Sequence, residues 1–237
     1  MERPVHFNRP APPHFKGFDP NGIVTSYQRN LPHWRQPGAT YFVTFRLDDS
    51  IPQNVLDYLA RLRAEYQLRS HEPAGRSLRE EYERHARTIL ENSLDEGHGA
   101  CVLQDEKNIQ IVKGRLDHGL GTQHFIGCAV VMPNHVHLIM KPFEGFELED
   151  ILGQIKGYSA IKINRRIGSR GTLWQDESYD RIIRDEEHLY RVIQYIGRNT
   201  AKIGHPSPDS IHWVHPEWIA AGWGFEDAPF PFQATTG

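Results

Sequence analysis

Hydrophobic residues follow two different spacings along the chain, and these spacings predict strands that alternate with helices. Short runs rich in β-branched and aromatic residues predict strands, and they lie at 41–47, 100–103, 125–140 and 181–183. Apolar residues three or four positions apart predict helices, within the segments 52–66, 77–92, 105–116, 143–167 and 185–203. Mixed strands and helices favour an α/β sandwich, in which helices pack on one sheet.

The two ends of the chain lack both spacings. Residues 1–38 are rich in Pro, Asn, His and Gly, so we expect an irregular N-terminal arm. Residues 205–237 form a tail that carries Trp213, Trp218 and Trp223 among Pro and Gly residues. We expect this tail to be ordered by packing its aromatic rings on the domain. The main domain is therefore expected at 39–204, with a helical insertion at about 52–92.

Composition is that of an ordinary soluble protein. Hydrophobic residues make up 38% and charged residues 24% of the chain, a balance that argues against a disordered protein. No apolar run approaches the roughly 20 residues of a membrane helix, and the first residues lack the apolar core of a signal peptide. Cys101 and Cys128 are far apart in the sequence, so we expect no disulfide framework. The sequence predicts a cytoplasmic protein with no membrane partner.

Positive charge is concentrated in one segment, although the net charge of the chain is −3. Residues 153–204 contain ten Lys and Arg and six Asp and Glu, and 10 − 6 gives +4. Such a local excess favours a phosphate-backbone partner. The candidate DNA-binding cations are Lys156, Lys162, Arg165, Arg166, Arg170, Arg181, Arg198 and Lys202. Trp174 and Tyr179 are candidates for stacking on unpaired bases, although packing in the core explains them equally well.

A histidine pair lies in the strongest predicted strand. Alternate side chains of a strand share one face, so His135 and His137 point the same way, about 7 Å apart along the strand. Two imidazoles in this arrangement can bind one divalent ion, but two solvated histidines on a polar face have the same spacing. The preceding Pro133 and Asn134 indicate a bulge or bend where the pair begins, and such bends often orient functional side chains.

The last predicted helix carries a second set of polar side chains. Asp185 is a good N-cap for this helix. Tyr195, Asn199 and Lys202 are spaced i, i+4 and i+7, so they share one helix face. A carboxamide oxygen can bind a hard divalent ion, a phenol can act as a nucleophile, and an ammonium can balance phosphate charge. The alternative is that Tyr195 is a boundary residue, with its ring on the core and its hydroxyl in water.

These residues together resemble the single-tyrosine (Y1, HUH) transposases of the IS200 type, and more closely the REP-associated tyrosine transposases. The His-hydrophobe-His motif is His135-Val136-His137, within residues 131–138. Further supporting stretches lie at 31–35, 41–47, 173–180, 184–189 and 195–199. The resemblance covers about 31–204. The family commonly has Pro after the helix Asn, where this chain has Thr200.

The resemblance implies a ferredoxin-like α+β fold with the histidine motif on a central strand of an antiparallel sheet. It implies that Tyr195 is the nucleophile and that His135, His137 and Asn199 hold Mg²⁺ or Mn²⁺. The implied activity is cleavage and rejoining of single-stranded or hairpin DNA through a 5′-phosphotyrosine, by a monomer or a homodimer. The helical segment at about 52–92 is long for the minimal family fold and is expected to be an elaboration.

Three other readings of the sequence stay open. A metal-dependent phosphodiesterase or RNase would use water in place of Tyr195. A non-catalytic DNA-binding regulator would keep the fold and bind hairpin DNA equally well with and without metal. A structural zinc protein is disfavoured, because the two cysteines are not clustered.

Overall fold

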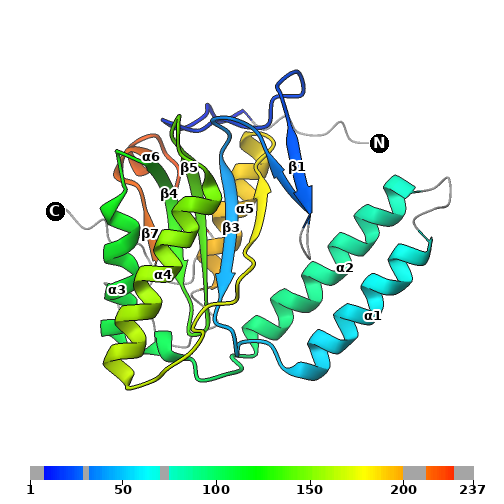
Figure 1. Cartoon of the computed structure of the whole chain (residues 1–237). Coiled ribbons are helices and arrows are strands. Elements are labelled where there is room, and N and C mark those ends of the chain that lie inside the picture. The colour runs from blue at the N-terminus through cyan, green and yellow to red at the C-terminus, as the bar shows by residue number, and fades with distance from the viewer. Residues whose placement is uncertain (1–7, 29–31, 70–74, 200–211, 227–237) are drawn as a thin grey trace.

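A five-stranded antiparallel sheet forms the centre of the protein (Figure 1). The computed structural model describes residues 8–28, 32–69, 75–199 and 212–226. The order of the strands across the sheet is β6-β3-β5-β4-β7. The strands are β3 (Tyr41–Arg46), β4 (His124–Val131), β5 (His135–Pro142), β6 (Tyr179–Ile182) and β7 (His212–Val214).

The chain order of strands and helices is that of a ferredoxin-like sandwich. Helix α3 (Glu106–His118) connects β3 to β4, and α4 (Leu148–Ile167) connects β5 to β6. These two helices pack together on one face of the sheet, and α5 (Glu186–Asn199) covers the other face (Figure 1). The predicted α+β class is confirmed, with the histidine motif on the middle strand β5.

The two faces of the central strands have different roles. On the face toward α4, Phe45 packs edge-on against Trp174, and Trp174 Nε1 donates to Ser159 Oγ of α4. On the opposite face, the His137 ring contacts the Tyr195 ring of α5, with centroids 5.3 Å apart. Strand alternation therefore places the histidine pair on the sheet face under α5, opposite the face that packs on α4.

Residues 125–140 were predicted as one strand, and this prediction was wrong. They belong to the hairpin of β4 and β5, in which Met132 N donates to His135 O at 2.8 Å across the turn. Pro133 and Asn134 lie in this turn and not in a bulge. Nearly all residues of both strands are buried on both faces, and apolar residues flank the turn on either side, so only Pro133 and Asn134 mark its place in the sequence.

The bulge of this hairpin lies instead between Ile126 and Cys128. A Cβ atom at Gly127 would lie only 2.1 Å from the Trp218 ring. The close approach of this ring therefore requires glycine at the bulge.

The helical insertion consists of α1 (Gln53–Arg69) and α2 (Gly75–Asp95), two antiparallel helices that project from the lower edge of the sheet (Figure 1). The Tyr66 and Tyr82 rings stack between them, with centroids 4.7 Å apart. The prediction of a strand at 100–103 was wrong. A 3-10 turn (Val102–Gln104) occupies this place, and it follows Cys101, which has a φ of 46°.

The N-terminal arm is less irregular than expected. Within it, β1 (Thr25–Gln28) and β2 (Pro32–Arg35) form a two-stranded antiparallel ladder. The arm also meets the C-terminal tail, because Trp218 Nε1 donates to Pro13 O and Trp223 Nε1 donates to Pro10 O. Trp218, on the short helix α6 (Pro216–Ala220), and Trp223 are both fully buried, as the prediction of a tail ordered by its aromatic rings required.

None of the helices in the described part of the chain has both the length and the apolar character that a bilayer crossing requires.

Candidate active site

The two histidines of β5 meet at their Nε2 atoms. His135 and His137 are both buried, and their Nε2 atoms lie 3.0 Å apart. The strand alternation that puts both rings on one face is as predicted. The ring planes are inclined at 74°, so the two nitrogens converge on one point beneath α5.

Each histidine is held in place by a bond at its other ring nitrogen. Asn134 Nδ2 donates to Leu94 O and His98 O, so Asn134 Oδ1 must accept from His135 Nδ1, at 2.8 Å. His137 Nδ1 lies 2.7 Å from Thr44 Oγ1. The Asn134 contact therefore leaves the Nε2 lone pair of neutral His135 directed into the site, which is the arrangement expected of a metal-binding imidazole.

Helix α5 carries Tyr195 to the same point and Asn199 next to Tyr195. Tyr195 Oη lies 3.5 Å from His137 Nε2. Asn199 is fully buried one turn later, and its Nδ2 donates to Tyr195 O at 2.8 Å. The helix start is as predicted, because Asp185 Oδ1 accepts from His188 N at 2.7 Å. The third predicted member of this face, Lys202, lies outside the described residues.

Burial raises the pKa of the Tyr195 phenol above its usual range, and the carboxylates of Glu91 and Asp95 raise it further. Asn199 and the Arg87 guanidinium act in the opposite direction. Glu91, Asp95 and Arg87 all belong to α2, so the helical insertion contributes charges to the surroundings of Tyr195.

The donor set fits a divalent ion. With metal–nitrogen bonds of about 2.1 Å, two nitrogens 3.0 Å apart subtend about 90° at the ion, the angle between neighbouring ligands of an octahedral site. The Asn199 carboxamide offers the oxygen that hard ions prefer. In the part of the chain that the structure describes, no group of three or more His, Cys, Asp and Glu side chains could hold a metal ion. A site at this place therefore depends on the carboxamide as its third ligand.

The predicted DNA-binding residues do not gather at one place. Trp174 is a core residue with 4% of its surface exposed, so its assignment as a base-stacking residue was wrong. Lys156 Nζ donates to Gln175 O and Asp176 O, which ties α4 to the loop before β6. Five further predicted cations lie exposed on α4, on the turn after it or on α5, and these are Lys162, Arg165, Arg166, Arg170 and Arg198.

Of the predicted cations, Arg181 shares the sheet face of the histidines. Thr44 pairs with His137 on one side and with Tyr179 on the other, and Arg181 lies two residues beyond Tyr179. The residues that sequence reasoning missed are Asn134, which orients His135, and the charged residues of α2. The Pro-Asn pair before the histidines was the available signal for Asn134. No sequence signal linked α2 to the site.

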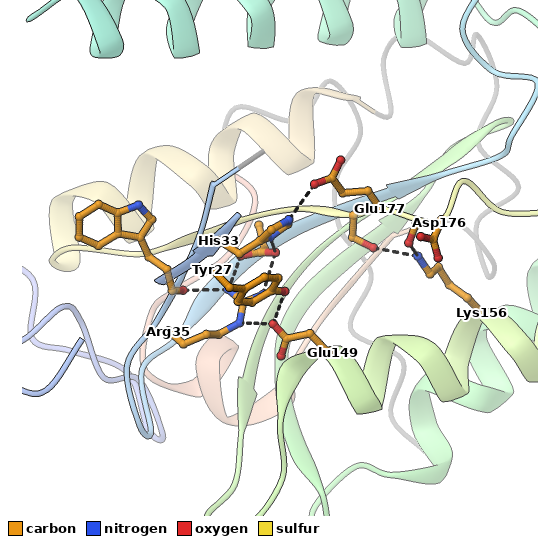
Figure 2. Close-up of polar contacts among 10 residues, drawn as sticks. Tyr27, His33, Arg35, Glu149, Lys156, Asp176 and Glu177 are labelled. Atoms are coloured by element: carbon orange, nitrogen blue, oxygen red, sulfur yellow. Dashed lines mark hydrogen bonds and ion pairs between the residues drawn. The ribbon is translucent and has the colours of Figure 1, made fainter. Parts of the chain in front are cut away.

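A buried ionic network lies on the other face of β6 (Figure 2). Asp180 accepts from His33 Nδ1 at 2.6 Å and from Arg35 Nη2 at 3.0 Å. Glu177 lies 3.0 Å from His33 Nε2, and Glu149 of α4 accepts from Arg35 Nε at 2.6 Å. Tyr27 also hydrogen-bonds Glu149. The network thus joins the β1-β2 ladder of the arm to β6 and α4.

Hydrogen bonds hold the charges of this network in place. Burial alone lowers the pKa of His33, but hydrogen bonds to Asp180 and Glu177 outweigh it and raise that pKa to about 9. Burial alone raises the pKa of Asp180, but the His33 and Arg35 contacts outweigh it and lower that pKa. The network is therefore a set of matched charges at neutral pH.

Residues 121–199, which are 79 of the 237 residues, match the model of the family described as "Transposase IS200 like". This segment runs from just before β4 to the end of α5 and contains His135, His137, Tyr195 and Asn199. The resemblance to IS200-like transposases is therefore confirmed for this segment, which carries the candidate site and spans about a third of the chain.

Similar solved structures include two transposases. One is described as "Structure of the REP associates tyrosine transposase bound to a REP hairpin", with 18% identity and a TM-score of 0.43 over 90% of this chain and 95% of that chain. Another is a Deinococcus radiodurans R1 protein assigned as a transposase, with 13% identity and a TM-score of 0.29 over 77% of this chain and 97% of that chain. No curated protein matches the chain.

Proposed function

We propose that this protein is a metal-dependent single-stranded DNA endonuclease and strand transferase whose nucleophile is Tyr195. The observation that carries the proposal is the convergence of three groups from two elements. The Nε2 atoms of His135 and His137 lie 3.0 Å apart, and Tyr195 Oη lies 3.5 Å from the second of them. A phenol beside a pair of metal-binding imidazoles is suited to attack on a phosphodiester.

In the proposed reaction, Tyr195 Oη forms a bond to the phosphorus and the bond from phosphorus to the 3′-oxygen breaks. The phenol loses one proton and the 3′-oxygen gains one, so the products are a 5′-phosphotyrosine and a free 3′-OH. The phosphotyrosine retains the free energy of the diester bond. Attack of a 3′-OH on it therefore rejoins strands without ATP.

The residues that would hold Mg²⁺ or Mn²⁺ are His135, His137 and Asn199. When bound, the ion would polarise the scissile phosphate and stabilise its developing charge. Asn134 and Thr44 orient the imidazoles, and Asn199 is anchored to the backbone of Tyr195. This chain therefore supplies a pre-oriented set of donors, which keeps the reorganisation needed for catalysis small.

The cavity beside His137 supports a single-stranded substrate. Its volume is about 360 Å³, and its walls are α1, α2 and the sheet. A cavity of this size accommodates a ligand of small-molecule dimensions, such as one unpaired nucleotide. We assign the catalytic domain to residues 39–204, with the α1-α2 pair as its insertion.

A first test compares two tyrosines of α5. Tyr195→Phe should lower the yield of covalent protein–DNA adduct by roughly 10⁴-fold or more, because the attacking oxygen is removed. Adducts are measured on denaturing gels after incubation with labelled single-stranded hairpin DNA and Mn²⁺. Tyr190→Phe is the matched control, since its hydroxyl bonds Glu226 away from the histidines. Cleavage that persists in Tyr195→Phe would mean that water or another residue attacks.

A second test separates catalysis from binding. His135→Ala should abolish metal-dependent cleavage, and removal of the ion with a chelator should do the same to the unchanged protein. Binding of single strands should persist in both cases. Equal hairpin binding with and without metal, together with no cleavage by the unchanged protein, would instead identify a non-catalytic regulator.

A further inference from the structure

Two cavities meet along the inner side of α2. The first opens at His137, and the second, of about 460 Å³, extends beside β6 to Trp34 of the arm. Both are lined by Arg87 and Tyr179. Together they form one groove between α2 and the sheet, which we call the α2 groove. It runs from the candidate active site to the β2 strand.

The distance from this groove to the histidines follows from the pairing of the strands in the sheet. His137, Thr44 and Tyr179 occupy one row across β5, β3 and β6. Neighbouring strands are about 4.8 Å apart, so Tyr179 lies about 10 Å from His137 across the sheet. Arg181 lies on the same face, in the row of Phe42. The Phe42 ring packs near those of His137, Tyr179 and Tyr195, so aromatic rings connect the histidine site to β6 beneath the groove.

Positive charge dominates the outer part of the α2 groove. Its charged lining residues, among those described, are Arg84, Arg87, Arg181, Arg184 and Asp180. The carboxylate of Asp180 is already bonded to His33 and Arg35 on the other face of β6. The four guanidinium groups therefore lack a matching acidic group within the described lining of the outer groove.

Arg181 shows a specific deficit of hydrogen-bond acceptors. Its Nε is buried and has no hydrogen-bond partner among the described residues, while its Nη2 contacts His188 Nε2. Buried donors are normally paired, so an acceptor from outside the chain is expected here. Burial lowers the pKa of Arg181, and the nearby Arg87 and Arg184 lower it further, whereas Tyr179 acts in the opposite direction. A phosphate would supply both the acceptor and the negative charge.

An exposed aromatic ring stands at the end of the same groove. Trp34 is 47% exposed although it is a large apolar side chain. Exposed aromatic rings beside cations are the usual means by which proteins bind unpaired bases, since each base stacks and each phosphate is neutralised. The groove therefore combines the two features that a single strand requires.

We propose that the α2 groove binds the single-stranded DNA segment adjoining the scissile phosphate, with a backbone phosphate at Arg181 and Arg184 and an unpaired base on Trp34. The proposal rests on the proposed function of Tyr195 for the location of the scissile phosphate. It gives the helical insertion a role, because α2 forms the outer wall of the channel.

The test measures reversible binding in the Tyr195→Phe background, so that no covalent step contributes. The ligand is a fluorescein-labelled oligothymidylate of about 12 nucleotides, within the site sizes of single-strand grooves, and binding is followed by anisotropy over a range of NaCl concentrations. Arg184→Gln should raise Kd about fivefold and reduce the slope of log K against log [NaCl] by about 0.7, the value for one lost phosphate contact. Arg184→Lys should restore that slope.

Trp34→Ala should raise Kd about tenfold at an unchanged salt slope, because it removes stacking and no charge, and Trp34→Phe should recover most of the affinity. Tyr158→Ala is the matched aromatic control, since Tyr158 is also 47% exposed but lies on α4. Lys107→Gln on α3 is the charge control. Both controls should leave Kd within about twofold, and thermal melting checks that every variant is folded.

The groove proposal would be overturned if Arg184→Gln and Trp34→Ala bound the oligothymidylate with the same Kd as the two controls, whether or not Tyr195 forms an adduct. Failure of the unchanged chain to bind the oligothymidylate would also overturn it. Selective loss of binding in the two groove variants, with no adduct formed when Tyr195 is intact, would support the groove and reject only the cleavage function. Binding and adduct assays therefore separate the two proposals.

Discussion

Strand β6 carries charged side chains on both faces, and the two faces differ in whether these charges have partners within the chain. On one face, Asp180 is buried with His33 and Arg35, and each charge has a partner within hydrogen-bond distance. On the other face, Arg181 lies among further arginines in the α2 groove, and its Nε has no acceptor in the described part of the chain. Asp180 and Arg181 are consecutive residues of one short strand, so the alternation of side chains alone places them in two different charge clusters.

The difference shows which cluster serves the fold and which can serve a ligand. A buried charge costs several kcal/mol unless it is paired, so a cluster closed to solvent must be matched within the chain. A cluster that lines a groove can stay unmatched, because water or a ligand supplies the missing charge. We therefore interpret the Asp180 cluster as a support that holds the arm and β6 in place, and the Arg181 cluster as a surface for phosphate.

The largest expected effect comes from breaking the matched cluster. Asp180→Asn leaves Arg35 and His33 buried with one carboxylate fewer, and should lower the free energy of unfolding by about 3 kcal/mol. Urea denaturation measures the change. Glu187→Gln is the control, because its ion pair with Arg191 is more than half exposed and should contribute at most about 0.5 kcal/mol. If Asp180→Asn lowered the free energy of unfolding no more than this control does, the Asp180 cluster would not stabilise the fold and the distinction between the two faces would be wrong.

An intermediate effect should appear as a pH dependence of stability. The pKa of His33 is raised to about 9 in the folded protein, above the unfolded value of about 6.5. Its contribution is therefore fully present below pH 6.5 and is lost as pH rises through about 9. Between pH 6 and pH 9.5 the loss should be on the order of 2 kcal/mol, or about 4–8 °C in Tm.

The groups that face His33 are Asp180, Glu177, Arg35 and the stacked Tyr27 ring. The pKa of Asp180 is lowered and those of Arg35 and Tyr27 are raised, so none of these three titrates inside the window. Thermal melting of His33→Gln across the same pH range is the comparison. An equally steep fall in Tm for that variant would assign the pH dependence to another group.

The smallest expected effect is on the stability of the unmatched cluster. Arg184 is exposed and has no ion pair like that of Asp180 among the residues that the structure describes, so Arg184→Gln should change the free energy of unfolding by no more than about 0.5 kcal/mol. The substitution also relieves repulsion among the arginines, so the free energy of unfolding is expected to rise or fall only slightly. Thermal melting at low salt measures it. A loss comparable to that of Asp180→Asn would show that the groove arginines hold the fold together.

Local patterns predicted most of the elements that carry the site. The strand with His135 and His137, and the helix with Tyr195 and Asn199, both appear with the predicted faces. The turn at Pro133 was missed because Pro133 and Asn134 indicate equally a bulge or bend within one strand and a turn between two strands. The 3-10 turn at 102–104 was taken for a strand because a run of four residues is too short to show either period. The assignment of Trp174 to DNA failed because a sequence does not distinguish a buried tryptophan from an exposed one.

The sequence by itself determined that two imidazoles share one strand face and that a phenol and a carboxamide share one helix face, since these relations follow from the geometry of a single element. Only the tertiary structure decided that these two faces meet. It also decided that Asn134 orients His135 through α2, and that Asp180 is fully paired while Arg181 Nε has no hydrogen-bond partner among the described residues. The physical reason is that charge balance and hydrogen-bond satisfaction depend on side chains from distant segments, which only the sheet register and helix packing bring together.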